Sequence, residues 1–232
     1  MAMKIIKQTD RPIRVPVEGV CAGKRDRERV PEIMQNRIER VLITRAVIEA
    51  RVKTLARQIA KHYQKRDRLK LIYILEGAGM FALDLAREIF NAKGPELRIL
   101  SIKARTYGEE LKQEGEVSRQ VKIIFAPTGL SGEEILIAED IVDQGFTLSA
   151  VKEWLLEEAG VKDVKICALL EKRLGHPTPR VREIRKRLKL DWVGFTIPDR
   201  WVAGYGVDAG DDFRALPYLA IVREEYYLKG KK

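Results

Sequence analysis

The sequence predicts an α/β domain with a mainly parallel central sheet flanked by helices. Short apolar runs, typical of buried strands, alternate along the chain with segments in which apolar residues recur every three or four positions, as on one face of a helix. The connections between these elements are short, and this alternation is typical of a parallel sheet. Ligands of such domains gather at the carboxyl ends of the strands, so the residues that follow each strand are functional candidates.

The first long helix is expected at about residues 44–63, where apolar residues recur at intervals of three and four. A strand is expected at residues 71–75, followed by a tight turn at 76–79 and a second helix that continues to Phe90. Residues 97–102 form the next mostly apolar run. They lead into Thr106 and Tyr107 and then into a polar stretch that ends near Ser118, which we predict to be a mobile loop.

The run at residues 135–138 predicts a buried strand, the helix after it closes at Gly160, and residues 164–170 predict the next strand. Residues 1–35 mix Pro12, Pro16, Gly19 and Gly23 with charged residues and lack sustained periodicity, so we expect an N-terminal arm of turns and short extended pieces. Residues 36–232 are then expected to form one large domain.

The formal net charge of +10 favours polyanionic partners, whether nucleic acid, acidic membrane or phosphorylated small molecules. Much of the excess lies in residues 4–29 and 180–189, and such runs usually mark solvated surface. Cys21 and Cys167 lie far apart and suggest neither a disulfide framework nor a zinc site. No apolar run approaches the roughly 20 residues that a membrane span needs, so we expect a cytoplasmic protein.

Residues 135–148 (ILIAEDIVDQGFTL) form the most informative motif. A turn that contains glycine at the start of a helix presents free backbone N–H groups and the positive end of the helix dipole, which suits a phosphate. Thr147 is expected to cap this helix. The adjacent carboxylates Glu139 and Asp140 can hold ribose hydroxyls or Mg²⁺. Asp143 can exchange a proton with a base bound beside the sugar. An ordinary strand, turn and helix with solvated acids is the alternative reading.

This motif resembles the phosphoribosyl pyrophosphate signature of type I phosphoribosyltransferases, and specifically of the hypoxanthine-guanine phosphoribosyltransferase family, over about residues 39–222. The resemblance implies the type I phosphoribosyltransferase fold, with a small hood formed by terminal segments. It also implies that Glu139 and Asp140 hold the ribose hydroxyls and that Asp143 acts as acid and base at purine N7. The 5′-phosphate would lie in a cradle formed by Asp143, Gln144, Gly145, Phe146 and Thr147.

Two further segments resemble the purine site of this family. Lys172, in the run LLEKR, matches the lysine offered to the purine 6-oxo group, and an ammonium group selects a carbonyl because it can only donate. Trp201 matches the aromatic residue that stacks on the base, and the backbone of Val202 would bond its edge. Asp208 is placed with this purine segment and also matches a magnesium-associated aspartate, so the expected metal ligands are Glu139, Asp140 and Asp208.

The pyrophosphate site is expected to contain Glu76, Gly77 and Arg214, since arginine offers a rigid fork of donors to phosphate. Thr106 and Tyr107 would belong to a mobile lid, where the family commonly has Ser-Tyr. Three positions depart from the family pattern. The family often has lysine at the position of Glu76, threonine at that of Gln144 and a basic residue at that of Phe146.

The resemblance implies an enzyme of purine salvage that converts a 6-oxopurine (hypoxanthine, guanine or xanthine) and phosphoribosyl pyrophosphate to the nucleoside monophosphate and pyrophosphate. It implies Mg²⁺ as cofactor and a homodimer or homotetramer. The alternative is a regulator on the same fold that binds RNA or a nucleotide effector. That alternative is motivated by a basic cluster, in a segment longer than its family counterpart, at Arg180, Arg182, Arg185, Lys186, Arg187 and Lys189.

Overall fold

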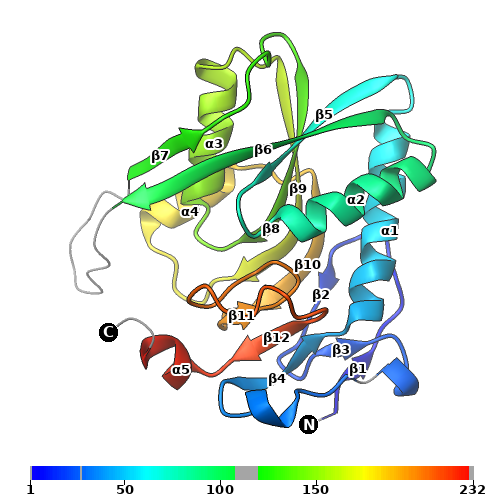
Figure 1. Cartoon of the computed structure of the whole chain (residues 1–232), viewed down its shortest axis with the longest axis vertical. Helices are drawn as coiled ribbons and strands as arrows, with labels where there is room; N and C mark the ends of the chain where they lie inside the picture. Colours follow the sequence, from blue (N-terminus) through cyan, green and yellow to red (C-terminus); the bar gives the residue numbers. More distant parts are fainter. Residues whose placement is uncertain (1, 27, 108–119, 230–232) are drawn as a thin grey trace.

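The computed structural model describes residues 2–26, 28–107 and 120–229 (Figure 1). Its strands are β1 (Lys4–Ile5), β2 (Ile13–Arg14), β3 (Val20–Cys21), β4 (Ile38–Ile43), β5 (Arg68–Ile74), β6 (Glu96–Tyr107), β7 (Gln120–Phe125), β8 (Glu134–Val142), β9 (Asp163–Arg173), β10 (Trp192–Pro198), β11 (Val202–Ala203) and β12 (Leu219–Val222). Its α-helices are α1 (Arg45–His62), α2 (Gly79–Asn91), α3 (Phe146–Glu157), α4 (Pro179–Arg187) and α5 (Glu224–Lys229).

The central sheet has seven strands in the order β2-β10-β9-β8-β5-β6-β7. All neighbours in it are parallel except β7, which runs antiparallel to β6. This confirms the prediction of a mainly parallel sheet. A second sheet of five strands, in the order β1-β3-β4-β12-β11, is built from segments near both ends of the chain. We call this second sheet the hood, and Figure 1 shows it below the central sheet.

Two apolar layers cover the central sheet, one on each face. Along β8, Leu136 and Ala138 pack in the cluster that contains the buried residues of α1 and α2. Ile135 and Ile137 point the other way and pack with the buried residues of α3. Successive side chains of a strand point to opposite faces, so a strand covered on both sides is apolar at every position. This is why residues 135–138 form a continuous apolar run.

The N-terminal arm contributes strands to both sheets. Its β2 pairs with β10 at the edge of the central sheet, while β1 and β3 extend the hood beside β4. Val15 and Val20 are fully buried between them. These contacts tie residues 1–35 to the rest of the fold, and the boundary at residue 35 stays a prediction.

Helix α4 occupies the segment that the sequence singled out only for its charge. Proline at the first helical position and Thr178 at the N-cap start it, and the hydroxyl of Thr178 accepts a hydrogen bond from the N–H of Val181 at 3.3 Å. None of the helices in the part of the chain that the structure describes combines the length and the apolar composition needed to cross a bilayer. The predicted mobile loop between Tyr107 and Ser118 lies outside the described residues.

Candidate active site

The predicted phosphate cradle joins the end of β8 to the start of α3. Gly145 is the N-cap residue of α3 and has a φ of 86°, a left-handed conformation that glycine adopts without strain. A Cβ atom at this position would lie 2.7 Å from Leu188 Cδ1, so the leucine side chain would have to move to admit a larger residue. The predicted cap was therefore wrong: Gly145 takes that position, and Thr147 is the second residue of the helix. The first turn of α3 still leaves backbone N–H groups without intrahelical partners, and such groups can donate to a phosphate.

The acidic pair, Glu139 and Asp140, lies near the carboxyl end of β8. Glu139 is buried, and its Oε2 atom has no hydrogen-bond partner among the described residues. Burial, and then the charge of Asp140, raise the pKa of Glu139 well above its ordinary value. Burial also raises the pKa of the partly buried Asp140 to about 6. A buried carboxylate without a partner is costly, so this pair is arranged for a ligand that supplies hydroxyl donors or a cation.

The predicted pyrophosphate loop follows β5 and lies directly against the acidic pair. A Cβ atom at Gly77 would collide with the carboxylate of Asp140, which explains why this position is glycine. The backbone of Gly206 packs against the carbonyl of Gly77, and that segment carries Arg214, whose Nη1 donates to the carbonyl of Gly206 at 2.9 Å. The structure therefore brings Glu76, Gly77, Asp140 and Arg214 into one place.

A cation that the sequence reasoning missed lies beside Glu76. Lys103 Nζ donates to Glu76 Oε1 at 3.0 Å from the neighbouring strand β6. The hydrogen bond and charge of Lys103, followed by the charge of Arg214, hold the pKa of Glu76 below its usual value. Lys103 and Arg105 are two residues apart on a strand, and this alternation is the signal that would place both on one face. The loop thus gains from β6 the cation that Glu76 does not provide.

The predicted purine site assembles at the end of β9. Lys172 is buried, and its Nζ lies 2.8 Å from Asp143 Oδ2 and 5.2 Å from the centre of the Trp201 ring. Val202 is buried in β11, opposite Ile221 of β12 in the hood. A flat base placed on the indole ring would therefore meet an ammonium donor and a carboxylate along its edge.

The three predicted metal ligands do not form a cage. Asp208 pairs with Arg214, with Oδ1 2.9 Å from Nη2, and its Oδ2 accepts from the N–H of Asp211 at 2.9 Å. Within residues 2–26, 28–107 and 120–229, no three acidic, histidine or cysteine side chains gather closely enough to hold a metal ion by themselves. Mg²⁺ commonly takes one or two carboxylates and completes its shell with substrate phosphates, and Glu139 with Asp140 fits that pattern.

Helix α4 contacts the cradle at two points that the sequence reasoning did not foresee. The guanidinium carbon of Arg180 lies 5.3 Å from the ring centre of Phe146, so a cation approaches the position where the family often has a basic residue. Arg185 is partly buried and bonds to three oxygen atoms of the β8 and β9 ends. The reading of the whole basic cluster as solvated surface was therefore wrong for Arg185. Gln144 lies in the turn. Thr106 and Tyr107 are the last two residues of β6 and pair with β7, so their backbone belongs to a strand, while their side chains are outside the described part.

Comparison with known proteins agrees with this geometry. A family model for the phosphoribosyl transferase domain matches residues 42–209. The hypoxanthine-guanine phosphoribosyltransferase of Bacillus subtilis is 36% identical over 196 residues, which cover 84% of this chain and 99% of the relative. The hypoxanthine phosphoribosyltransferase of Escherichia coli K12 is 35% identical over 191 residues, which cover 82% of this chain and 97% of the relative.

Solved structures that resemble this chain are also hypoxanthine phosphoribosyltransferases. A hypoxanthine phosphoribosyltransferase from Staphylococcus aureus superposes with a TM-score of 0.71 at 30% identity, over 85% of this chain and 98% of that chain. The enzyme of the same name from Trypanosoma cruzi, solved in complex with the product IMP, superposes with a TM-score of 0.69 at 30% identity, over 85% of this chain and 99% of that chain. The chain belongs to the phosphoribosyltransferase family, in the group of the hypoxanthine-guanine phosphoribosyltransferases.

Proposed function

We propose that the protein is a purine salvage enzyme that joins a 6-oxopurine to phosphoribosyl pyrophosphate and releases pyrophosphate. The observation that carries this proposal is the contact of Lys172 Nζ with Asp143 Oδ2 at 2.8 Å, beside the Trp201 ring and at the mouth of the Gly145 cradle. A base reader and a proton acceptor thus lie in contact, and the proton acceptor is two residues before the glycine of the phosphate site. The relatives named for this reaction support the same conclusion.

Each part of the site has a role in this reaction. Purine N9 forms a bond to C1′ as the bond from C1′ to the pyrophosphate oxygen breaks, and pyrophosphate leaves with that electron pair. The proton that the purine loses passes from N7 to Asp143, which Lys172 holds in place. One ammonium hydrogen of Lys172 bonds to Asp143, which leaves others for the 6-oxo group. Trp201 supplies the stacking face.

The departing pyrophosphate lies between the Gly77 loop and Arg214, and the guanidinium group stabilises the charge that develops there. Glu139 and Asp140 hold the ribose hydroxyls, and the same carboxylates would hold Mg²⁺. When bound, Mg²⁺ supplies charge neutralisation at the pyrophosphate. Thr106 and Tyr107 end β6 and lead into the segment that we propose closes over the site to exclude water from the reacting ribose.

We also propose a cytoplasmic location and a homodimer or homotetramer. Support for assembly comes from the outer face of α2, where Met80, Leu83 and Phe90 are 43%, 42% and 78% exposed. The RNA-binding alternative is less favoured, because Arg185 and Arg187 of the basic cluster are already paired with Glu171 and Glu183.

The test is an assay of pyrophosphate release with phosphoribosyl pyrophosphate, Mg²⁺ and, in separate reactions, hypoxanthine, guanine, xanthine, adenine and uracil. We expect turnover with at least one 6-oxopurine and none with adenine or uracil. The substitution Asp143→Asn removes the proton acceptor and should lower kcat by about 10²–10⁴-fold. Turnover with adenine, or full activity of Asp143→Asn, would contradict the roles given to Lys172 and Asp143.

A further inference from the structure

Helix α4 packs against the outer side of the phosphate cradle. Leu188 Cδ1 and Ile184 Cγ2 lie 2.7 Å and 3.4 Å from the place where Gly145 would carry a Cβ atom. Ile184 and Leu188 belong to the same apolar cluster as Val142 and Leu148, at the end of β8 and the start of α3. Figure 1 shows α4 beside α3. The helix is therefore in direct contact with the turn that carries Asp143.

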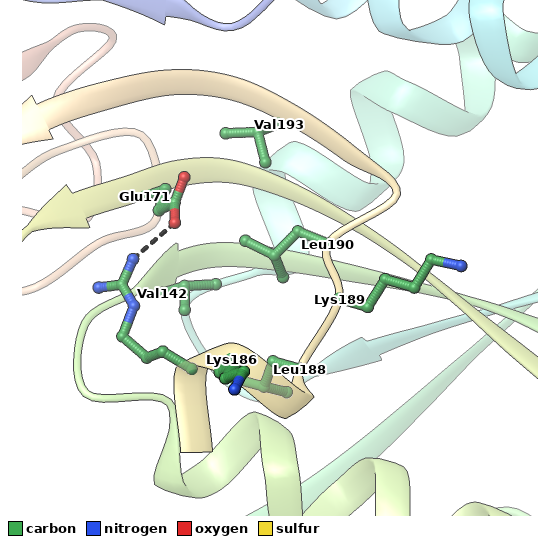
Figure 2. A pocket seen from close by; sticks show the side chains of 8 residues that line it. Val142, Glu171, Lys186, Leu188, Lys189, Leu190 and Val193 are labelled. Carbon is green, nitrogen blue, oxygen red and sulfur yellow. Dashed lines mark hydrogen bonds and ion pairs between the residues drawn. The ribbon is translucent and has the colours of Figure 1, made fainter. Parts of the chain in front are cut away.

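The guanidinium group of Arg185 joins the two strand ends that form the purine site. Its Nη1 donates to the carbonyl of Asp143 at 2.9 Å and to the carbonyl of Lys172 at 2.8 Å. Its Nη2 pairs with Glu171 Oε1 at 2.6 Å, the ion pair marked by the dashed line in Figure 2. The side chain is 18% exposed, so these contacts are largely shielded from water. One side chain thus bonds to the main chain of both residues that read the base.

We propose that Arg185 is a positioning residue that sets the spacing of Asp143 and Lys172 and thereby the binding and reaction of the purine. This inference rests on the proposed function. Asp143 follows β8 and Lys172 lies in β9, so the distance between their side chains depends on how the two strand ends sit. The planar fork of arginine bonds to several acceptors in a fixed geometry, which a flexible side chain does not do.

The chemistry explains why a small change here should matter. The carboxylate of Asp143 and the ammonium group of Lys172 must reach N7 and the 6-oxo group of one rigid base at the same time. Without Arg185, two main-chain carbonyls lose a charged donor and the strand ends can shift. A misplacement of about 1 Å in such a constellation costs on the order of 10²-fold in rate.

Another residue of the basic cluster, Arg187, supplies a matched control. Arg187 lies on the same helix and is exposed, and its guanidinium pairs with Glu183 at 2.9 Å within α4. It has the same helix propensity as Arg185 and similar charge, but it does not bond to the strand ends. The substitution Arg187→Ala therefore reports what the loss of one arginine does to α4 itself.

A cavity beside Arg185 allows chemical rescue. It has a volume of about 250 Å³ and is lined by Arg185, Glu171 and Val142 among others (Figure 2). Truncation of Arg185 to alanine joins the space of its side chain to this cavity. A free guanidinium ion can then enter from solvent and bond to the carbonyls and to Glu171. A purely structural role in α4 would not respond to this ion.

The experiment compares wild type, Arg185→Ala, Arg185→Lys and Arg187→Ala in steady-state kinetics with each substrate varied in turn, with and without millimolar guanidinium chloride. For Arg185→Ala we expect kcat/KM for the purine to fall by about 10–100-fold, while KM for phosphoribosyl pyrophosphate changes by less than about threefold. Guanidinium should restore part of the loss in this variant alone. Arg185→Lys should lie between the two extremes, and Arg187→Ala should match wild type.

Purine kinetics of a folded Arg185→Ala within twofold of wild type would overturn the inference, as would equal losses for both substrates without rescue. If Arg185→Ala does not fold, Arg185→Lys decides: an unchanged kcat/KM for the purine would overturn the inference, and a selective loss would support it. Wild-type protein that converts no 6-oxopurine would overturn the proposed function itself. Active wild type with an indifferent Arg185 would overturn only the positioning role.

Discussion

At the scale of single residues, Asp140 shows how the site is held ready at a cost in stability. Burial raises its pKa in the folded protein to about 6, above the value of about 4 of an aspartate in an unfolded chain. Between these values the folded state binds a proton that the unfolded state does not. The free energy of unfolding therefore falls as the pH rises from about 4 to about 6, and the penalty is complete above the folded pKa.

We expect Asp140→Asn to be more stable than wild type at pH 8 and to lose this advantage toward pH 4. After discounting for the partial exposure of the carboxyl, a gain on the order of 1 kcal/mol at pH 8 corresponds to about 2–4 °C in Tm. Thermal unfolding from pH 4 to 8 measures the effect. Asp67→Asn, at an exposed aspartate in the turn before β5, is the control. A Tm difference that does not change with pH would contradict the prediction.

At the scale of elements, the start of α3 makes Gly145 the most sensitive position of the cradle. A φ of 86° costs an L-residue roughly 1–2 kcal/mol. A methyl group there would also press on Leu188 of the segment after α4. We expect Gly145→Ala to raise KM for phosphoribosyl pyrophosphate, because the backbone N–H groups that face the phosphate must move.

Gly132→Ala is a matched control for this prediction. Gly132 has a φ of 76°, and a Cβ atom there would meet nothing within 4 Å. It should share the cost in stability and leave KM for phosphoribosyl pyrophosphate unchanged. Substrate kinetics together with thermal unfolding of both variants separate the two effects. Equal KM values in Gly145→Ala and wild type would show that the cradle tolerates the shift.

Several of the helices and strands were predicted from the sequence, but contacts between different elements were not. Helix α1 spans Arg45–His62, close to the expected residues 44–63, because its pattern of apolar spacing is local. The strand and turn around residues 135–147 were predicted for the same reason, with the family resemblance adding the roles. The contacts of Arg185 and Lys103 were not predicted. They join residues from different elements, and a basic side chain has the same local signature whether it is solvated or bonded to a strand end.

At the scale of the whole molecule, the N-terminal arm connects the hood to the central sheet. Val15 follows β2 and is fully buried, and its N–H donates to the carbonyl of Thr196 in β10 at 2.9 Å. Its carbonyl accepts from Arg173 Nη2 at 2.9 Å, next to Lys172 in β9. The arm therefore supports the strand end that carries the purine-reading lysine, although it is remote from that residue in sequence.

Two valines in the arm test this support, because they differ in burial and not in chemistry. Val15 is 0% exposed and Val17 is 40% exposed. We expect Val15→Ala to lower the free energy of unfolding by about 1–3 kcal/mol, since it leaves a cavity in the core. Each kcal/mol corresponds to about 2–4 °C in Tm for a chain of this length. Val17→Ala should change Tm little. Equal Tm values for the two variants would mean that the arm does not hold this position in solution.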